Sequence, residues 1–452
     1  MLELFYMFSF LNKSKNNKRV YLDYAGATPI GVRAKRALLE TLDEYGNPSA
    51  IYKEGVDAKK FLNIARKKIG DVINARSHEI YFVGSGTESC NLAIFGTYHN
   101  WKKENEHTTK LPHIIVSAIE HPAVMEAVTH LAINNLANIT VLPVYENGIV
   151  KVQDVKNAIT PETILISVMY ANNEIGTVQP IKEIGRVVAE SRKQKAESRN
   201  TDTGNSQSEF PNCQLPSADY PLLHTDACQA GNYLNLDVFR LKVDLMTLNS
   251  SKVYGPKGIA VLYKKESVKL SPIILGGGQE RDLRSGTEAL PLAVSFAEAL
   301  VESQEIKEKE SERLTALRDK FKEELNKRIS NVTFYGEWED RKQEAESRKQ
   351  KVRSTKHEEM LRLPNNINCR IPGIISEEMI LRLDVKGFAI SHKSACASQI
   401  DDSSYVIKAL GASDTEAKEN VRITLGRSTK WEDLEKLIDA IEEISNKFSM
   451  KQ

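Results

Sequence analysis

The sequence predicts an α/β protein in which a mainly parallel sheet carries helices on both faces, followed by a second, smaller domain. As far as residue 263, strand-like apolar runs alternate with amphipathic segments, and this rhythm is typical of such a sheet. Beyond Pro291 the pattern becomes helical, with apolar residues at helical spacing over residues 292–326. A chain of 452 residues is long enough for two domains with a large core between them.

Six apolar runs are expected to form strands of this sheet: IYFV (80–83), HIIVSA (113–118), TILISVMY (163–170), LLHT (222–225), VDLMTL (243–248) and GIAVLY (258–263). Two polar, charged segments, 193–220 and 338–359, interrupt the rhythm and are interpreted as surface insertions. The heptapeptide AESRKQK occurs at 189–195 and again at 345–351. A matched recognition pair is conceivable, but repetition on tolerant surfaces is the favoured interpretation.

The composition argues against several classes of binding partner and structural site. The sequence has sixty-two basic and sixty-one acidic residues, so no overall positive electrostatic field favours binding to nucleic acid or to an anionic membrane. The five cysteines, at positions 90, 213, 228, 369 and 396, form no CxxC pair and have no histidine at metal-ligand spacing, so neither a disulfide framework nor a metal site is expected. Residues 1–11 are apolar but too short to span a bilayer, and the basic run 12–19 is interpreted as a solvated leader. We expect a cytoplasmic protein.

An aspartate and a lysine end two neighbouring strand runs. Asp226 follows the run 222–225, and Lys252 lies between the run 243–248 and a glycine turn. These are the two groups that a pyridoxal phosphate enzyme places around one ring, because the lysine forms a Schiff base and the aspartate keeps the pyridine nitrogen protonated. Alone, Asp226 would more often be a helix cap, but its pairing with Lys252 favours a cofactor enzyme. Gln229 could reach the phenolic oxygen of the same ring.

Two further strand ends carry groups that suit such a cofactor. Residues 84–91 (GSGTESCN) follow a strand run and open a helix, so backbone amides and the Thr87 hydroxyl could bind a phosphate. This turn is not a P-loop, because no Gly-Lys-Ser/Thr closes it, and alone it would be an ordinary strand-to-helix turn. His121, after the run 113–118, could stack on a pyridine ring and shuttle protons. Its alternative is a hydrogen-bonded loop histidine.

A cysteine in a polar stretch is a candidate nucleophile. Cys396 lies in SACAS (394–398), which continues as QIDDSS with little apolar cover. A reachable and mobile thiol there could visit a buried cofactor, although a surface cysteine without a role has the same pattern. Only a few per cent of an ordinary thiol is ionised at neutral pH, and the sequence does not show an activating group.

From Tyr21 to about Ile444 the sequence resembles the cysteine desulfurases of the NifS and IscS type, which have the class V aminotransferase fold. The resemblance rests on ten ordered blocks: YLDYAGATP (21–29), GNPSA (46–50), GTESCNLAI (86–94), EHPAV (120–124), NNEIGTVQ (172–179), HTDACQ (224–229), KVYGPKG (252–258), GGGQERDLRSGT (276–287), SACAS (394–398) and ITLGRST (423–429). It implies fold type I of the pyridoxal phosphate enzymes. The large cofactor domain, with a seven-stranded sheet, would span 20–304, and a smaller α+β domain would comprise 1–19 and 305–452, with the catalytic cysteine loop at about 391–405.

The resemblance also implies a role for each matching residue. Lys252 would be the Schiff-base lysine and Asp226 the partner of the pyridine nitrogen, while His121 would be the ring-stacking acid–base residue. The other cofactor-binding positions would be Gly86, Thr87, Asn173, Gln229, Asn249, Ser251 and Thr287. Thr287 would reach the phosphate site of the other subunit, which implies a homodimer with shared active sites. Arg422 would grip the substrate carboxylate as a planar, bidentate guanidinium, and Asn47 and Asn173 would line the same pocket.

The implied reaction is removal of sulfur from L-cysteine, which gives L-alanine and a persulfide on Cys396. The persulfide would pass to an iron-sulfur scaffold protein or a sulfur-carrier protein, for iron-sulfur cluster assembly or tRNA thiolation. Two alternatives stay open. One is a selenocysteine lyase or another class V enzyme, and the other is a non-catalytic paralogue that serves as a binding scaffold.

The sequence departs from the family pattern in its two polar insertions, which have no counterpart there, and at three further places. Ser251 stands where a phosphate-binding histidine is usual, and its hydroxyl can still donate to phosphate. Cys90 and Cys228 stand where relatives often carry Asp and Thr, and both are interpreted as core thiols. Residues 391–393 (SHK) place two potentially cationic groups near Cys396, where they would lower its pKa, guide an acceptor, or be ordinary loop variation.

Overall fold

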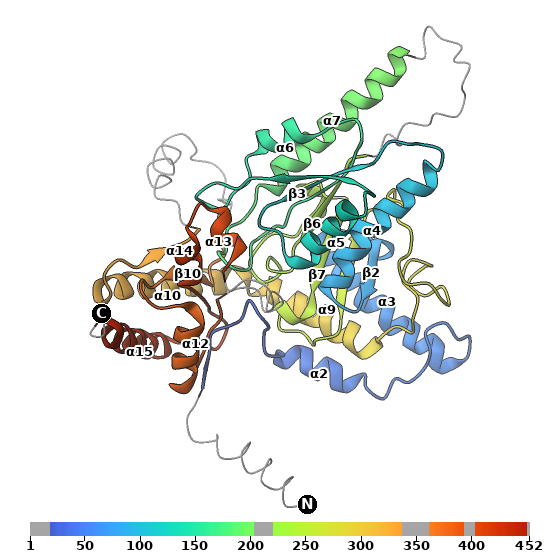
Figure 1. Cartoon of the computed structure of the whole chain (residues 1–452). Coiled ribbons are helices and arrows are strands. Elements are labelled where there is room, and N and C mark those ends of the chain that lie inside the picture. The colour runs from blue at the N-terminus through green and yellow to red at the C-terminus, as the bar shows by residue number, and fades with distance from the viewer. Residues whose placement is uncertain (1–18, 203–219, 337–360, 393–402, 450–452) are drawn as a thin grey trace, which may run out of the picture.

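A computed structural model of the chain describes residues 19–202, 220–336, 361–392 and 403–449. The predicted nucleophile Cys396, the second AESRKQK copy and most of both polar insertions lie outside these ranges. Figure 1 shows a sheet with its helices, and beside it the later elements from α10 onward gathered on one side. This later group contains a small sheet of its own.

The central sheet has seven strands in the order β2-β8-β7-β6-β5-β3-β4. Its strands are β2 (Ile80–Val83), β3 (His113–Ser117), β4 (Asn138–Leu142), β5 (Thr163–Ser167), β6 (Leu222–Asp226), β7 (Leu245–Asn249) and β8 (Ala260–Lys264). Neighbouring strands run parallel except at β8, which is antiparallel to both β2 and β7. The predicted α/β class with a mainly parallel sheet is confirmed.

Helices bury both faces of this sheet because side chains alternate along each strand. Ile80 and Phe82 of β2 belong to one hydrophobic core, which includes residues of α2, α3, α6, α7 and α9. Tyr81 and Val83, their neighbours, belong to a second core with residues of α4 and α5. The near-continuous apolar strand runs therefore reflect burial on two sides.

The helices around the central sheet are α2 (Val32–Glu40), α3 (Lys53–Ile73), α4 (Gly86–Glu104), α5 (Pro122–Ile133), α6 (Val152–Ala158), α7 (Ile181–Asp202), α8 (Val238–Leu241) and α9 (Leu290–Glu305), with 3-10 turns η2 (Ser77–Glu79) and η3 (Ser250–Lys252). The later elements are α10 (Lys307–Arg328), β9 (Thr333–Phe334), β10 (Asn366–Arg370), α12 (Ser376–Val385), β11 (Phe388–Ala389), α13 (Tyr405–Ala409), α14 (Asp414–Lys418), β12 (Asn420–Thr424) and α15 (Trp431–Ser449). Strands β12, β10 and β9 form an antiparallel sheet.

The start of the described chain packs against its end. Strand β1 (Val20–Tyr21) pairs in parallel with β11, and Asp23 bridges to Thr424 of β12. The chain then crosses to α2 beneath the central sheet (Figure 1). This crossing brings residues 23–26 over the carboxyl ends of the sheet strands, where they line a pocket with later residues.

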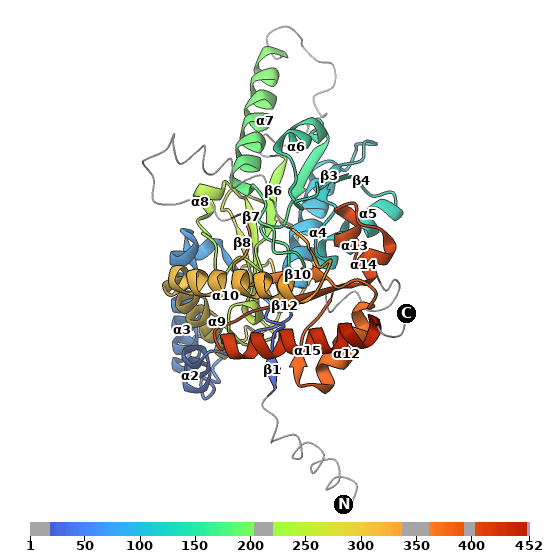
Figure 2. The same ribbon diagram turned by 90° about the vertical axis from the view of Figure 1, so that its left-hand side faces the viewer.

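Two sequence-based expectations need correction. Strand β4 was not among the predicted strands, because at the sheet edge only its last residue, Leu142, is buried and the apolar signal is weak. The predicted insertion at 193–220 begins inside helix α7, which continues to Asp202 and projects from the body of the molecule (Figure 2). Arg192, from the first AESRKQK copy, forms an ion pair with buried Asp244 and donates to the Pro221 carbonyl. This copy therefore contributes a structural contact.

Among the helices that the structure describes, none is both long enough and apolar enough to cross a membrane.

Candidate active site

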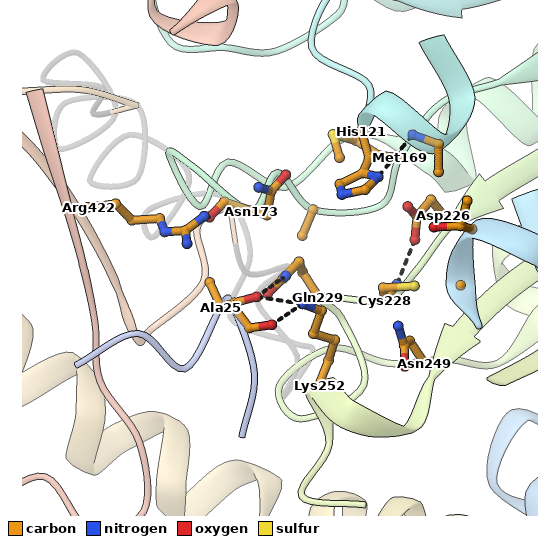
Figure 3. A pocket seen from close by; sticks show the side chains of 15 residues that line it. Ala25, His121, Met169, Asn173, Asp226, Cys228, Gln229, Asn249, Lys252 and Arg422 are labelled. Atoms are coloured by element: carbon orange, nitrogen blue, oxygen red, sulfur yellow. Dashed lines mark hydrogen bonds between the residues drawn. The ribbon is translucent and has the colours of Figure 1, made fainter. Parts of the chain in front are cut away.

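A pocket opens at the carboxyl ends of the parallel strands, where ligands bind in open α/β sheets (Figure 3). Strands β3, β5, β6 and β7 each deliver a lining side chain at or just beyond their last residue. The lining residues are Ala25, Gly26, Gly86, Thr87, His121, Ala123, Met169, Ala171, Asn173, Asp226, Cys228, Gln229, Asn249, Lys252 and Arg422.

The amino end of α4 forms one wall of the pocket. Gly86 and Thr87 are its first two residues, so their amides have no acceptor within the helix, and Ser85 caps the helix by accepting from the Glu88 amide at 3.1 Å. A Cβ on Gly86 would lie 3.1 Å from Cys228 Sγ and 3.2 Å from Asn249 Nδ2. Glycine thus keeps open a cradle of donors beside a positive helix end, which suits a phosphate.

Asp226 ends β6 and lies deep in the pocket with 7% of its surface exposed. Its Oδ1 accepts from the Cys228 amide at 2.9 Å. The second thiol, Cys90, lies behind the wall and is 1% exposed. Burial raises the pKa of both thiols well above the usual value, so Cys90 and Cys228 stay protonated beside this carboxylate. Both thiols were predicted to lie in the core. Cys90 does so, whereas Cys228 lines the pocket.

Lys252 ends the 3-10 turn η3, directly after β7, and points its amine into the pocket (Figure 3). The amine donates to the Ala25 carbonyl at 2.9 Å and to the Gly26 carbonyl. Gln229 Nε2 donates to the same Ala25 carbonyl at 3.0 Å. The backbone carbonyls of residues 25 and 26 thereby fix the position of the Lys252 amine in the pocket.

His121 is the residue before α5, and its ring lies over the pocket. Its Nδ1 accepts from the Ala123 amide at 3.1 Å, which fixes the ring orientation and leaves Nε2 toward the pocket side (Figure 3). Burial, the largest effect, lowers the pKa of His121, against the opposing influence of Asp226. The ring is therefore a neutral imidazole at neutral pH, able to stack on a flat ligand and to take up a proton.

Arg422, on β12, closes the opposite end of the pocket and is 1% exposed. Its Nη2 pairs with Asp23 Oδ1 at 2.7 Å, and its Nη1 donates to the Asn173 carbonyl at 3.2 Å. A buried guanidinium held by two neighbours is suited to binding a small carboxylate. The pocket is thus lined by the amino end of α4, by a guanidinium on β12 and by the Lys252 amine.

Comparison with known proteins identifies the family. The model of the class V aminotransferase family matches residues 20–195 and 214–437. Cysteine desulfurase IscS from Clostridium botulinum strain Hall is 35% identical over 430 residues, which cover 95% of this chain and 94% of the relative. The chain belongs to the cysteine desulfurases of the class V aminotransferase family. IscS from Dictyoglomus turgidum is also similar, at 36% identity over 432 residues, covering 95% of each chain.

Two solved structures have the same fold. A NifS-like protein superposes with a TM-score of 0.76 at 25% identity and covers 95% of this chain and 99% of its own. SspA, solved in complex with cysteine, superposes with a TM-score of 0.67 at 29% identity and covers 90% of this chain and 98% of its own. The sequence-based assignment to this family is confirmed.

Nine of the residues predicted for a cysteine desulfurase site meet in this pocket: Gly86, Thr87, His121, Asn173, Asp226, Gln229, Asn249, Lys252 and Arg422. Three others lie elsewhere in the described chain. Ser251 donates to Asn249 Oδ1 at 3.2 Å and supports the wall from behind. Asn47 and Thr287 are exposed and do not line the pocket of their own chain. Cys396 lies outside the described residues.

Several pocket residues were not predicted as site residues. Ala25 and Gly26 contribute backbone carbonyls, and Met169, Ala123 and Ala171 contribute apolar wall. No side-chain chemistry marks such positions in a sequence. The only available signal was their proximity to predicted blocks, since residues 25 and 26 fall within YLDYAGATP.

A second histidine, His224, lies buried in β6 behind the pocket and does not contact it. Its Nδ1 pairs with Ser167 Oγ at 2.8 Å and its Nε2 with Thr247 Oγ1 at 3.0 Å. Burial lowers the pKa of His224 to about 4. Because the unfolded chain binds a proton near the ordinary value while the folded chain does not, its contribution to stability is complete above about pH 6.5 and is lost as the pH falls toward 4.

We therefore expect the free energy of unfolding to fall by about 2 kcal/mol between about pH 7 and about pH 4.5 through His224 alone. Urea unfolding at the two pH values measures this change. The His224→Gln protein is expected to be less stable at neutral pH but to have a shallower pH dependence, and the exposed His107→Gln change serves as control. An equally steep dependence in His224→Gln would contradict this assignment.

Proposed function

We propose that this protein is a pyridoxal phosphate-dependent cysteine desulfurase that converts L-cysteine to L-alanine and holds the sulfur as a persulfide on Cys396. The observation that carries the proposal is the single pocket in which Lys252, Asp226 and His121 surround the space next to Arg422. Strand ends far apart in the sequence supply these groups. The family to which the chain belongs supports the same activity.

The described residues fit pyridoxal phosphate. The α4 cradle at Gly86 and Thr87 would hold its phosphate, Asp226 its pyridine nitrogen, and Lys252 its aldehyde carbon. His121 would cover the ring face, with Gln229 and Asn173 near the phenolic oxygen; Asn249 would add a phosphate donor, and Ser251 would support it. When bound, the cofactor withdraws electrons from the α-carbon of an amino acid.

The protein's own groups would perform the other steps. Arg422 binds the substrate carboxylate and thereby orients the amino group toward Lys252. The Lys252 amine and the His121 imidazole accept and return protons at the substrate carbons. Cys396 Sγ, as a thiolate, attacks the substrate sulfur. A sulfur–sulfur bond forms as the carbon–sulfur bond breaks, and its electron pair stays with carbon, which protonation completes to L-alanine.

A homodimer with shared active sites forms part of the proposal. Large apolar side chains are exposed on α2, on the loop that leads to α3 and on the loop before Thr287: Val32 (77%), Tyr45 (84%), Ile51 (96%) and Leu275 (80%). Large apolar side chains with this degree of exposure would be covered in a dimer. Thr287 is exposed on the same loop as Leu275, and it would reach the phosphate of the partner subunit. Asn47 is also exposed and lies between Tyr45 and Ile51 in the sequence.

The remaining parts of the proposal concern the persulfide acceptor, the location in the cell and the division into domains. The acceptor of the persulfide would be an iron-sulfur scaffold protein or a sulfur carrier, because Cys396 lies in a polar stretch with little apolar cover, which suits delivery of sulfur to another protein. A cytoplasmic location is supported by the described cysteines, which are all free thiols. The domain division at residue 304 is supported by the separate small sheet of the later elements.

Anaerobic incubation of the cofactor-loaded protein with L-cysteine tests the function. We expect L-alanine, reductant-released sulfide, and a persulfide on the peptide that contains Cys396, detected by mass spectrometry. Cys396→Ala is expected to abolish alanine formation while keeping the cofactor absorbance, and Cys213→Ala, the same chemical change outside the family blocks, is expected to be unaffected. Full activity of Cys396→Ala would refute the proposed nucleophile. Activity on selenocysteine alone would establish the lyase alternative.

A further inference from the structure

The N-cap and the first residue of α13 contact two residues that are neighbours of pocket residues in the sequence. Ser404 precedes α13 and donates from Oγ to Glu174 Oε2 at 2.5 Å, while the same oxygen accepts from the Ile407 amide at 3.2 Å. Tyr405 donates from its phenolic oxygen to the Glu120 carbonyl at 2.6 Å. Ser404 is 1% exposed and Glu174 is fully buried, so solvent does not compete for that contact.

Both acceptors adjoin a pocket residue in the chain. The Glu120 carbonyl belongs to the peptide group that leads into His121, and because a peptide group is planar, holding its oxygen fixes the plane from which His121 emerges. Glu174 directly follows Asn173, whose carbonyl accepts from Arg422 Nη1 at 3.2 Å. Ser404 is thereby linked to the carboxylate end of the pocket, and Tyr405 to the imidazole.

The central sheet and the residues that follow its strands hold the Glu120 side chain. Glu120 Oε1 accepts from the Ser117 hydroxyl and from the Met169 amide at 2.9 Å, and the side chain is fully buried. Burial raises the pKa of Glu120 to about 8, so the group is uncharged near neutral pH and its segment carries no buried charge. The sheet therefore fixes the Glu120 side chain, and Tyr405 contacts the backbone carbonyl of the same residue.

We propose that Ser404 and Tyr405 are positioning residues that set His121 and the Asn173–Arg422 pair from the small domain. This inference rests on the proposed function, because it assigns these hydroxyls to the pocket of that reaction. The same two residues follow closely after Cys396 in the sequence. On the other side of Cys396, Ser391 exchanges backbone hydrogen bonds with Arg422 at 3.1 and 2.6 Å. The described chain before Cys396 is thus bonded to Arg422, and the described chain after it is bonded to the neighbours of His121 and Asn173.

The two contacts predict different kinetic defects. Tyr405→Phe removes only the hydroxyl that restrains the His121 peptide, so kcat for alanine formation is expected to fall about 2- to 10-fold and the pH profile of kcat to shift. Ser404→Ala frees the Asn173 segment, so KM for cysteine is expected to rise by a similar factor, about 2- to 10-fold. A general loss of folding would not divide the two parameters between the two variants.

Matched controls make the same two substitutions at sites away from the pocket. Tyr145→Phe removes a phenol that donates to Asp154 at 2.9 Å away from the pocket, and Ser413→Ala removes the cap of α14. Neither is expected to change kcat or KM. In a His121→Gln background, Tyr405→Phe is expected to have no further effect on kcat, because the residue it positions is gone. An undiminished effect in that background, or unchanged kinetics in both single variants, would overturn the proposal.

A second readout does not depend on desulfuration. The visible absorbance of the lysine-bound cofactor, titrated with pH without substrate, is expected to shift in Tyr405→Phe and not in Tyr145→Phe, since His121 adjoins the cofactor site. If the wild-type protein forms no alanine from cysteine yet this shift is present, the positioning role stands and the proposed function fails. If alanine forms and the titration is identical in both variants, the positioning role is refuted.

Discussion

Replacement of Lys252 by alanine is expected to abolish activity on L-cysteine, with a loss of at least about 10³-fold in kcat. Among the residues that line the described pocket, Lys252 is the only lysine, and it shares this pocket with the amino end of α4 and with Arg422. Loss of that amine removes both the covalent attachment of the cofactor and a proton carrier. The variant is also expected to lack the yellow absorbance of a lysine-bound cofactor after gel filtration, which absorbance spectra of the purified protein measure.

Lys257→Ala is the matched control for this change. It removes the same side chain from the same KVYGPKG block, but Lys257 is exposed and lies outside the pocket. Its spectrum and kcat are expected to equal those of the unaltered protein. Retention of a reducible cofactor–lysine adduct in Lys252→Ala would show that another lysine forms the attachment, and would contradict the assignment.

The fold was largely predictable because the sheet is buried on two sides. All six predicted strand runs coincide with strands, and runs such as IYFV need both faces covered to be so apolar. Edge strand β4 escaped prediction because one side of it is exposed to solvent. Nor could a local pattern show that β8 lies between β7 and β2, because its pairing with β2 involves residues such as Tyr81, which are far away in the sequence.

The site was predictable as far as its chemistry is carried by side chains. Asp226, Lys252 and His121 stand at strand ends, where their position in the sequence already implies a common edge. The backbone carbonyls of Ala25 and Gly26 and the α13 contacts of Glu120 and Glu174 were not predictable, since they depend on which segments the two small sheets bring together. The place of Cys396 relative to the pocket stays a prediction.

A buried ion pair at the base of the loop that carries Thr287 illustrates such a long-range contact. Arg66 of α3 holds Glu280 by two hydrogen bonds, of 2.7 and 2.8 Å, and the two side chains are 6% and 1% exposed. Glu280 Oε2 also accepts from the Phe82 amide at 2.9 Å. Glu280, Arg281 and Asp282 have φ values of +47°, +56° and +64°, and each such left-handed residue costs about 1–2 kcal/mol. The pair therefore anchors a strained turn.

Arg66→Met is expected to lower the free energy of unfolding by about 3–5 kcal/mol, because it leaves the Glu280 carboxylate buried without its cation. Guanidinium unfolding followed by circular dichroism measures the change. Lys67→Met, one residue along the same helix, breaks a surface pair with Asp71 whose side chains are 70% and 61% exposed, and is expected to change stability by less than about 1 kcal/mol.

The double variant Arg66→Met with Glu280→Gln distinguishes a buried charge from lost packing. If the cost arises from the unpaired carboxylate, removal of that charge should restore much of the stability lost in Arg66→Met, since replacing both partners of a buried pair is often nearly neutral. If the cost arises from packing, the second change should add to the first. An additive result would therefore refute the electrostatic role, whereas recovery would show that the unpaired Glu280 carboxylate causes the loss of stability in Arg66→Met.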